Sequence, residues 1–467
     1  MFSDTIAAIA TPIGEGGIAV IRVSGLEALA VVERCFRPAG KSSKSPAKAE
    51  SHTIHYGHVV RDGQVIDEVM LAVLRAPRTF TREDTVEISC HGGLLPAKLV
   101  LDAVLSSGAR PAQPGEFTRR AFINGRIDLA QAEAVADLIH SRTELALQAA
   151  NEQLAGKLSA RINQLRDDLM RVLAHVEAHI DFPDEDIAPD TQAELLGKLR
   201  AGVAFMDALL RTANEGQILR RGIRVAILGR PNAGKSSLLN QLLGHDRAIV
   251  SPVAGTTRDT IEETANIRGI PVVFIDTAGL RDSLDEIEAE GIRRSRDTAA
   301  KADLILHVID ASEPLTEADA HWLAEFSANK RILIRNKVDL PTHASVEELQ
   351  LRHLESGIRD PASQVVDMSC TTAAGLEELK DAIKNAVWSG QIGGEMLQAM
   401  SSSRHQDALQ RSRTATIRAA DALAGGLTLE LVAADLRLAV GAVGEIVGKT
   451  STEDLLDSIF SQFCLGK

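Results

Sequence analysis

The order of apolar and polar positions changes character several times along this chain of 467 residues. In the first 118 residues, short runs rich in β-branched residues predict strands, and a longer periodic run predicts a helix. The expected strands lie at 18–23, 69–74 and 85–89, the expected helix at 94–105, and an expected polar surface loop at 37–51. This N-terminal part is therefore predicted to be a mixed α/β domain.

A helical pattern replaces the strand pattern from about Ile127 onward. Apolar residues fall at helical spacing from Leu129 to Ile139, and from Leu158 to Val176 they alternate by four and three residues. The second run predicts one long helix with a heptad-like buried stripe. The stripe positions are Leu158, Ile162, Leu165, Leu169, Val172 and Val176.

The rest of the chain shows three successive patterns: an acidic turn, an alternation of strands and helices, and a final helical part. An acidic run with two prolines at 181–190 predicts a solvated turn. Strand and helix patterns then alternate as in a doubly wound sheet, and the chain is helical again from about Ala382 to Lys467. Helical segments on both sides suggest one discontinuous helical domain interrupted by an insertion. The expected domains are 1–118 (N-terminal), 119–218 (helical, first part), 219–380 (inserted α/β) and 381–467 (helical, second part), a multidomain α+β and α/β fold.

Composition narrows the possible partners and the compartment. The net charge of -13 gives no overall attraction for nucleic acid or an anionic membrane, so any RNA contact requires a local basic patch or a basic partner. The four cysteines, Cys35, Cys90, Cys370 and Cys464, have no metal-type spacing and suggest free thiols in the cytoplasm. No apolar run approaches the roughly 20 residues that span a bilayer, so no membrane association is expected.

Four short motifs carry the chemistry, and they occur in the order that guanine-nucleotide binding requires. They are GRPNAGKS at 229–236, GTTRD at 255–259, DTAG at 276–279 and NKVD at 336–339. Three of them lie at or just past the end of an apolar strand-like run, which is where phosphate and base contacts occur in such sheets. Together they predict a P-loop domain that binds and hydrolyses GTP.

Each motif supplies a different contact to the nucleotide. Gly229 and Gly234 allow the backbone N–H groups to face the phosphates, and Lys235 adds a positive charge at the β- and γ-phosphates. Ser236 is placed to ligate Mg²⁺, and Asp276 to hold the metal through water. The expected nucleotide contacts are Gly229, Asn232, Ala233, Gly234, Lys235, Ser236, Ser237, Thr256, Thr257, Asp276, Thr277, Ala278, Gly279, Asn336, Lys337, Asp339, Ser369, Cys370 and Thr371.

Guanine specificity follows from the NKVD motif. By resemblance to GTPases, Asp339 accepts both N–H groups of the guanine edge and Asn336 contacts the base. Adenine would leave that carboxylate without its partners. Ser369, Cys370 and Thr371 stand where GTPases have a second base-contact loop, and for Cys370 a small buried residue is the simpler interpretation.

One position departs from the pattern of many small GTPases. They carry Gln after DTAG to orient the attacking water, but here the residue is Leu280, which has no polar atom to offer. Catalysis must then use an arginine finger, a monovalent cation or a carboxylate further along the chain. Glu286, Glu288 and Glu290 follow closely, and each taken alone is more simply a solvated surface residue.

Four further segments carry a resemblance to one family over essentially the whole chain. They are ATPIGEGGIAVIRVSG at 10–25, FTREDTVEISCHGG at 80–93, PGEFTRRAFINGRIDLAQAEAVADLI at 114–139 and FCLGK at 463–467. They resemble the MnmE (TrmE) family of tRNA wobble-uridine modifying GTPases. The terminal Cys-x-Gly-Lys is the most specific of these signals.

The resemblance implies an architecture and a set of partners. It implies an N-terminal domain similar to tetrahydrofolate-binding modules that forms a homodimer, a discontinuous helical domain, and an inserted GTPase domain that associates with its counterpart in the transition state. It also implies a heterotetramer with the FAD-dependent protein MnmG, which acts on tRNA. The expected product carries an aminomethyl-type group on the wobble uridine, with a folate one-carbon unit as the methylene source.

The resemblance also implies roles for residues of the GTPase domain. Asn232 matches a K⁺ ligand, and the carbonyl groups of Ser251 and Val253, with Thr256, would complete that cation site. A K⁺ there supplies the charge that an arginine finger supplies elsewhere. Thr257 matches the second Mg²⁺ ligand beside Ser236. Glu288 matches a carboxylate that orients the attacking water, so Glu288 and Lys235 are the expected catalytic residues.

In the N-terminal domain the resemblance implies a folate site. Arg22 and Glu87 match family positions, and Lys467 matches the terminal lysine. Arg126 stands where some members have lysine, which keeps the charge but changes the geometry. Cys464 matches a cysteine important for modification, although it can also be a plain thiol near the chain end.

Two other functions are compatible with parts of the sequence. A ribosome-assembly GTPase of the Era or EngA type shares GRPNxGKS, but it carries an RNA-binding module or tandem GTPase domains, which this chain lacks. A non-catalytic dimeric scaffold that uses GTP only as a switch is compatible with Leu280, but Asn232 and Glu288 argue against it.

Overall fold

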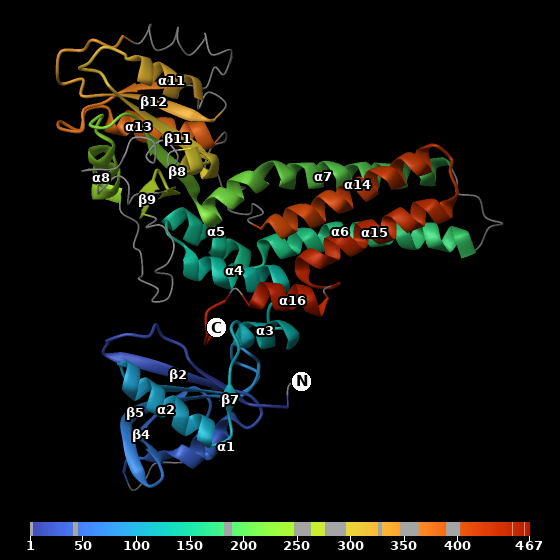
Figure 1. The fold of residues 1–467 in the computed structure, drawn as a ribbon. Helices are drawn as coiled ribbons and strands as arrows, with labels where there is room; N and C mark the ends of the chain where they lie inside the picture. Colours follow the sequence, from blue (N-terminus) through green and yellow to red (C-terminus); the bar gives the residue numbers. More distant parts are fainter. Residues whose placement is uncertain are drawn as a thin grey trace. The chain divides into compact units, whose positions relative to one another are not determined.

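The computed structural model of the protein describes most of the chain, and its residues form two compact units (Figure 1). The described residues are 3–40, 45–181, 189–246, 263–275, 296–325, 329–345, 364–388, 402–450, 452–461 and 463–467. Unit 1 comprises residues 1–136, 154–203 and 411–467, and unit 2 comprises residues 137–153 and 204–410. Both units therefore combine segments that are far apart in the sequence.

A seven-stranded sheet forms the N-terminal part of unit 1. Its spatial order is β3-β4-β5-β6-β2-β1-β7, with antiparallel neighbours except for the parallel pair β1–β7. The strands are β1 (Ile6–Ile9), β2 (Ile18–Ser24), β3 (Phe36–Pro38), β4 (Thr53–Arg61), β5 (Gln64–Leu74), β6 (Thr85–His91) and β7 (Arg110–Pro111). The helices α1 (Ala28–Cys35) and α2 (Leu94–Ser106) pack against this sheet, and a 3-10 turn, η1 (Pro46–Lys48), lies beside α1.

An aliphatic core holds the sheet and its two helices together. Every second residue of β6 and β2 points into it, and Val86, Ile88, Ile21 and Val23 are fully buried. Alternation with a period of two is what a sheet with one covered face requires. Burial of this apolar surface, at about 25 cal/mol per Å², is the main source of stability here.

A buried group of charges joins the start of β1 to the helix α3 (Glu116–Ile123). Arg120 is fully buried and lies 3.0 Å from Glu116, 3.3 Å from Glu83 and 2.9 Å from Asp4. Arg110 also pairs with Glu116 and Asp4. Burial alone would raise the pKa of Glu116, but hydrogen bonds from Arg110, Arg120 and the Gln113 N–H outweigh it and lower that pKa.

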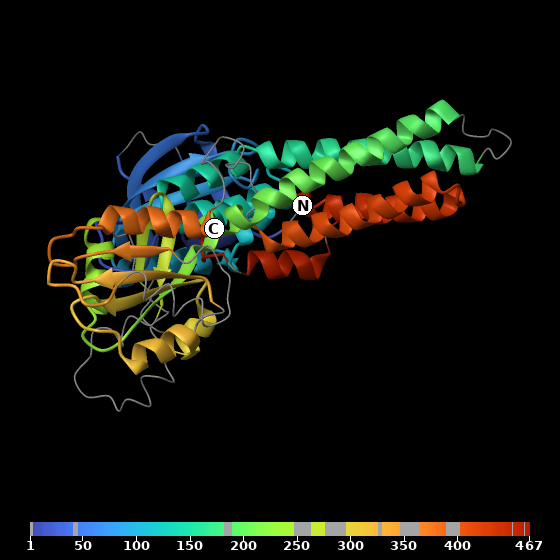
Figure 2. The same ribbon diagram turned by 90° about the horizontal axis from the view of Figure 1, so that it is seen from above.

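Four long helical segments pack alongside one another in the rest of unit 1 (Figures 1 and 2). They belong to α6 (Lys157–Asp181), the start of α7 (Pro189–Arg221), the end of α14 (Ser403–Ala424) and α15 (Leu429–Val447). The Gln192 amide donates to the Leu423 carbonyl between α7 and α14, and α6 packs along α15. The short helix α16 (Glu453–Phe460) and the first part of α4 (Leu129–His140) share a cluster around Leu129 and Phe460.

Unit 2 is built on a six-stranded sheet of the doubly wound type. Its order is β13-β12-β11-β8-β10-β9, and all neighbours are parallel except β10–β9. The strands are β8 (Ile223–Leu228), β9 (Glu263–Ile267), β10 (Ile270–Phe274), β11 (Leu304–Asp310), β12 (Arg331–Asn336) and β13 (Val365–Asp367). Nearly every residue of β8, β10, β11 and β12 is buried, as expected for strands covered on both faces.

The helices of unit 2 come from both of its chain segments. They include α8 (Lys235–Asp246), α11 (Glu317–Glu325), α13 (Leu376–Val387), most of α5 (Glu144–Leu154) and the second part of α7. Leu145 and Ala149 of α5 pack against the core of the sheet, and the Arg142 guanidinium donates to the Thr264 hydroxyl of β9 at 2.6 Å. A segment that the sequence places with the helical part is thus packed on the nucleotide-domain sheet.

Most predicted elements are present with small shifts of their ends. The strands at 18–23 and 85–89, the helix at 94–105 and the long helix with its six buried stripe residues are confirmed. The strand expected at 69–74 begins earlier, at Gln64, because it pairs with β4 along its length. The loop expected at 37–51 was only partly right, since Phe36–Pro38 pairs with β4 and residues 46–48 form η1.

Most of the acidic turn expected at 181–190 lies outside the described residues. No helix within the described ranges is both long and apolar enough to cross a membrane. The predicted combination of an N-terminal α/β domain, a discontinuous helical domain and an inserted P-loop domain is confirmed.

Arg120→Ala is expected to destabilise unit 1 by about 3–5 kcal/mol, because it leaves Glu83 and Glu116 buried without their cation. Calorimetric unfolding measures the loss. Arg119→Ala is the matched control on the same helix, and its exposed partner Asp457 makes a cost of about 1 kcal/mol or less the expectation. Equal losses would contradict a special role for the buried charges.

The same charges predict a pH dependence. The lowered pKa of Glu116 contributes stability that is present above the ordinary carboxyl value of about 4.3 and is lost as the pH falls through the lowered folded value. The difference in unfolding free energy between the parent and Glu116→Gln should therefore shrink on acidification.

Candidate nucleotide and folate sites

The phosphate loop lies between the end of β8 and the start of α8. Gly229 has a φ of 145° and Gly234 a φ of 99°, and both lie in the region that favours glycine. A Cβ at Gly229 would clash with the Val308 carbonyl, and one at Gly234 would clash with the Asn336 amide. The loop therefore needs glycine at both positions for conformation and for space. Asn232, between them, is exposed with a φ of 63°.

Lys235 folds back onto this loop. Its ammonium group donates to the carbonyl oxygens of Gly229 at 2.9 Å and Arg230 at 2.8 Å. Burial lowers the pKa of Lys235, because desolvation disfavours the charged form. A phosphate group in the loop would offset that desolvation, so the site favours an anion next to Lys235. Ser236 and Ser237 follow in the first turn of α8, with Ser236 half-buried and Ser237 exposed.

The base-recognition residues come from the ends of β12 and β13, at the same edge of the sheet. Asn336 is buried; its amide donates to the Ala233 carbonyl at 2.9 Å, and its side-chain oxygen accepts from the Cys370 N–H at 3.2 Å. The Asn336 side chain thus connects the phosphate loop to the loop of 369–371. Asp339 is exposed, as a residue that binds an incoming base must be.

The remaining contacts shape this loop. Ser369 is fully buried and accepts from the Thr372 N–H, whereas Thr371 is exposed. Cys370 is half-buried, its carbonyl accepts from the Gln241 amide, and burial raises the pKa of its thiol. Lys337 pairs with Asp310 at the end of β11.

Arg230 is a neighbour of the phosphate loop whose contacts the sequence analysis did not anticipate. It pairs with Asp319 at 3.1 Å and with Glu313 at 3.3 Å. Asp319 is buried and accepts from the N–H and hydroxyl of Thr316 at the start of α11. The motif position gave no signal for these contacts, because Asp319 lies far along the chain and the sheet brings it near.

The structure leaves part of the expected site undescribed. Nine predicted site residues and the neighbours of Glu288 fall in 247–262 and 276–295, outside the described residues. They are Ser251, Val253, Thr256, Thr257, Asp276, Thr277, Ala278, Gly279 and Glu288, with Leu280, Glu286 and Glu290 beside them. The described residues bring together Gly229, Asn232, Ala233, Gly234, Lys235, Ser236, Ser237, Asn336, Lys337, Asp339, Ser369, Cys370 and Thr371 around one sheet edge.

A second cluster of predicted residues lies in unit 1, where β2 and β6 pair. Arg22 stands opposite Glu87 in the register, and its Nε lies 2.8 Å from the carboxylate. Arg22 also donates to the Gly466 carbonyl at 3.1 Å and lies over the Phe117 ring at 5.7 Å. Burial, and then the charge of Arg22, lowers the pKa of Lys467, while Glu87 acts in the opposite direction. The C-terminal tail therefore meets the Arg22–Glu87 pair.

Close packing holds the C-terminal tail in this place. Gly466 has a φ of 87°, and a Cβ there would lie 2.5 Å from the Ile9 carbonyl oxygen. The Cys464 side chain is exposed, and its carbonyl accepts from the Gly115 N–H at 3.5 Å. The FCLGK ending thus presents a thiol and a lysine beside an ion pair.

Arg126 is placed differently from the other three predicted folate residues. Its guanidinium donates to the Thr79 carbonyl at 2.8 Å and lies over the Phe80 ring at 5.6 Å. Phe80 packs against the cluster that contains Phe117, the ring under Arg22. Arg126 is therefore connected to the Arg22–Glu87 pair through two aromatic rings.

Comparisons with known proteins agree over the whole chain. The family model "GTP-binding protein TrmE N-terminus" matches residues 5–126, and "MnmE helical domain" matches residues 129–464. A protein of Geobacillus thermodenitrificans is 47% identical over 99% of both chains, and one of Enterococcus faecalis is 45% identical over 99% of this chain and 98% of its own. Both are named tRNA modification GTPase MnmE.

Among solved structures, Aquifex aeolicus Era bound to GDP and aluminium fluoride is 28% identical. It covers 41% of this chain and 66% of its own, with a TM-score of 0.27, too low to carry an argument. The relatives that match from end to end are decisive instead. A chain with this identity over its full length, these two family models and a P-loop sheet belongs to the MnmE family of tRNA modification GTPases.

Proposed function

We propose that the protein is a K⁺-activated GTPase that works with the flavin-dependent partner MnmG to modify the wobble uridine of tRNA. The observation that supports this most directly is the presence of two separate sites on one chain. One is the phosphate loop with its guanine-type loops, and the other is the Arg22–Glu87 pair with the C-terminal tail. A cytoplasmic enzyme that couples GTP hydrolysis to a one-carbon transfer requires both.

The K⁺ proposal rests on Asn232. It is exposed on a left-handed turn of the phosphate loop, where its amide oxygen is available to a cation. We propose Ser251, Val253 and Thr256 as the other ligands, and Ser236 with Thr257 as the Mg²⁺ ligands. Cations at these positions supply positive charge near the phosphates. Glu288 is the proposed water-orienting base, and Lys235 the phosphate-binding cation.

The folate proposal rests on the charge of the tail cluster. Arg22 and Lys467 place two cations beside the carboxylate of Glu87, and these cations can pair with the glutamate carboxylates of an anionic folate. A carboxylate can accept up to about four hydrogen bonds, so Glu87 retains acceptor capacity for a pterin edge beyond its bond to Arg22. Arg126 and Cys464 belong to the same proposal, the latter as a thiol needed for modification.

A homodimer is proposed on the basis of an apolar face of the N-terminal sheet. Tyr56 and Met70 stand opposite each other on β4 and β5, and Ile54 and Val65 lie on the same two strands. These side chains are 46–71% exposed. Large apolar residues grouped on one open sheet face indicate an interface. A homodimer of this protein bound to one MnmG dimer would form the expected heterotetramer.

The alternative of a ribosome-assembly GTPase of the Era or EngA type has less support. Relatives named tRNA modification GTPase cover the chain from end to end, and the two family models match its N-terminal and helical parts. The domain boundaries 118, 218 and 380 remain a prediction, and the family models ending at 126 and starting at 129 support a division near the first of them.

GTP hydrolysis should be several times faster in K⁺ than in Na⁺ at equal ionic strength, because K⁺ completes the charge at the phosphates. Asn232→Ala should remove the difference. Asn240→Ala changes an exposed asparagine on the outer part of α8 and should leave it intact. Initial rates in the two salts provide the measurement, and equal rates for the parent protein would rule out the K⁺ assignment.

Glu288→Ala should lower kcat by about 100-fold or more with little change in GTP affinity, as expected for a residue that acts on the attacking water. Glu286→Ala and Glu290→Ala are matched controls and should have much smaller effects. Single-turnover hydrolysis and nucleotide titration separate the two quantities. A neutral Glu288→Ala variant would show that this residue is a solvated surface carboxylate.

Glu87→Gln should lose binding of a reduced folate and wobble-uridine modification, while GTP hydrolysis stays near normal. Glu68→Gln, an exposed carboxylate on neighbouring β5, should retain all three. Removal of residues 463–467 should also abolish modification and spare hydrolysis. Calorimetry with tetrahydrofolate, a GTPase assay and mass spectrometry of tRNA nucleosides test these points. Unchanged folate binding by Glu87→Gln would exclude this residue from the site.

A further inference from the structure

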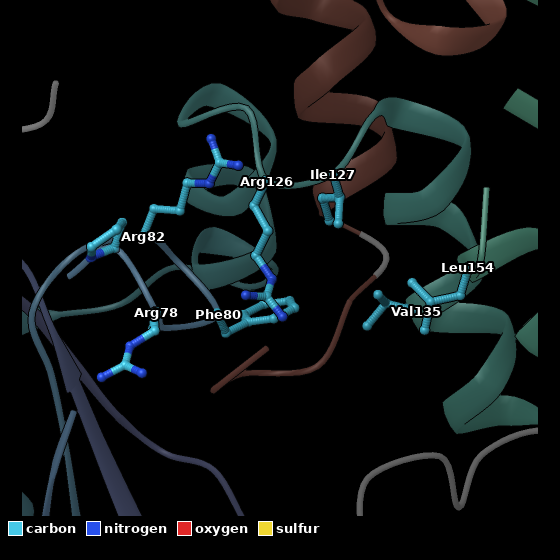
Figure 3. A pocket seen from close by; sticks show the side chains of 8 residues that line it. Arg78, Phe80, Arg82, Arg126, Ile127, Val135 and Leu154 are labelled. Atoms are coloured by element: carbon cyan, nitrogen blue, oxygen red, sulfur yellow. The ribbon is translucent and has the colours of Figure 1, made fainter. Parts of the chain in front are cut away.

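A pocket of about 770 Å³ lies within unit 1, next to Arg126 (Figure 3). The loop between β5 and β6 provides one wall, with Arg78, Phe80 and Arg82. The other lining residues are Pro77, Arg126, Ile127, Val135 and Leu154. In Figure 3 the Arg126 guanidinium lies over Phe80, and Val135 and Leu154 lie on the opposite side. The volume is in the range of small-molecule sites.

The charge of this pocket is unusual for the chain. Three of its eight lining residues are arginines and none is acidic, although the whole protein has a net charge of -13. Arg82 donates to the Asn124 carbonyl and Arg126 to the Thr79 carbonyl, both neutral groups. Across the described part of the chain, no ion pair is found for Arg78, Arg82 or Arg126. Three unneutralised cations around one hollow favour an anionic ligand.

Packed aromatic residues join this pocket to the proposed folate site. Phe80 lines the pocket and packs against the cluster of Ile6, Ala8, Ala112 and Phe117. Phe117 lies under Arg22, which binds Glu87 and the C-terminal tail. Arg126 itself belongs both to the pocket and to the residues proposed to bind folate. The proposed folate residues and the arginine-lined pocket therefore share Arg126 and meet where Phe80 packs against the Phe117 cluster.

We propose that this pocket binds the γ-linked oligoglutamate tail of the folate, and that Arg78 and Arg82 select folates with more than one glutamate. This inference rests on the proposed folate function. Each added glutamate contributes one carboxylate, and arginine pairs with carboxylates through strong charge-assisted hydrogen bonds. In Figure 3 the guanidinium groups of Arg78, Arg82 and Arg126 extend in different directions. Cations that point in different directions fit several separate carboxylates better than one compact anion.

The apolar wall of the pocket favours the oligoglutamate tail as the ligand over a segment of RNA. Ile127, Val135 and Leu154 offer no hydrogen-bonding side chain to a ribose or a base edge, whereas the methylene groups of a glutamate chain can lie against them. Phe80 is already covered by the Arg126 guanidinium and is thus not an open stacking surface for a base. The lining therefore combines apolar side chains, which can contact the methylene groups of the tail, with cations, which can pair with its carboxylates.

Calorimetry of the full-length protein with tetrahydrofolate carrying one or three glutamates tests the proposal. The triglutamate form should bind roughly tenfold more tightly at low salt, and the gain should shrink at high ionic strength. The double variant R78Q/R82Q should lose the gain and keep the affinity for the monoglutamate. R78E, which changes a single exposed side chain, should also reduce the gain. K98Q removes an exposed cation from α2 and should behave as the parent protein.

The outcomes separate this inference from the function on which it rests. If neither folate binds, the folate function itself fails. If both forms bind the parent protein equally, the folate function stands and the tail site is overturned. If R78Q/R82Q weakens tRNA binding in a gel-shift assay while the triglutamate gain persists, the arginines contact RNA and the tail proposal is wrong.

Discussion

One amide side chain holds the two halves of the nucleotide site together. Asn336 donates to the Ala233 carbonyl in the phosphate loop and accepts from the Cys370 N–H in the base loop. Because Asn336 ends β12 and is buried, its position is set by a strand that is paired on both sides. Glycine at 234 is required for the approach, since any Cβ would clash with this amide. The geometry of the GTP site thus depends on sheet register.

The neighbouring strands add charge to the same edge. Lys337 pairs with Asp310 at the end of β11, and Arg230 of the phosphate loop pairs with buried Asp319 at α11. Parallel strands place their carboxyl ends together, so the phosphate loop after β8 and the loop of 369–371 after β13 meet at one edge of the sheet. Each local segment needs only suitable side chains at its strand end, because the pairing of the strands in the sheet sets the distances between these side chains.

In unit 1 the residues proposed to bind folate come from a pair of antiparallel strands and from the end of the chain. Arg22 and Glu87 face each other in an antiparallel register, and the tail is held against them by Gly466. Nearby, buried Arg120 joins three acidic residues from separate segments. Such buried charges are strongly destabilised when one partner is lost, so the tail site sits on a part of the molecule with little tolerance for change.

The sequence alone determined what could be read from local pattern. The stripe from Leu158 to Val176 follows from helical period, and the long helix with this buried stripe was confirmed. The motifs at 229–236 and 336–339 lie at the ends of β8 and β12, where the apolar runs before them place strand ends. The sequence could not predict which charged residues pair, because contacts such as Arg230–Asp319 join residues that are far apart along the chain. The packing of α5 against the nucleotide-domain sheet was missed for the same reason.

The tertiary structure decided which charges remain without a partner. Arg78 and Arg82 look like ordinary surface residues in the sequence, and only the fold brings them beside Arg126 and Phe80 around one pocket. The loop expected at 37–51 is shorter in the structure, because Phe36–Pro38 pairs with the edge of β4. Helical period and short motifs involve residues that are close together in the sequence, so they can be read from the sequence. Strand pairing, pockets and ion pairs join residues that are distant in the sequence, and these residues come close only when the chain is folded.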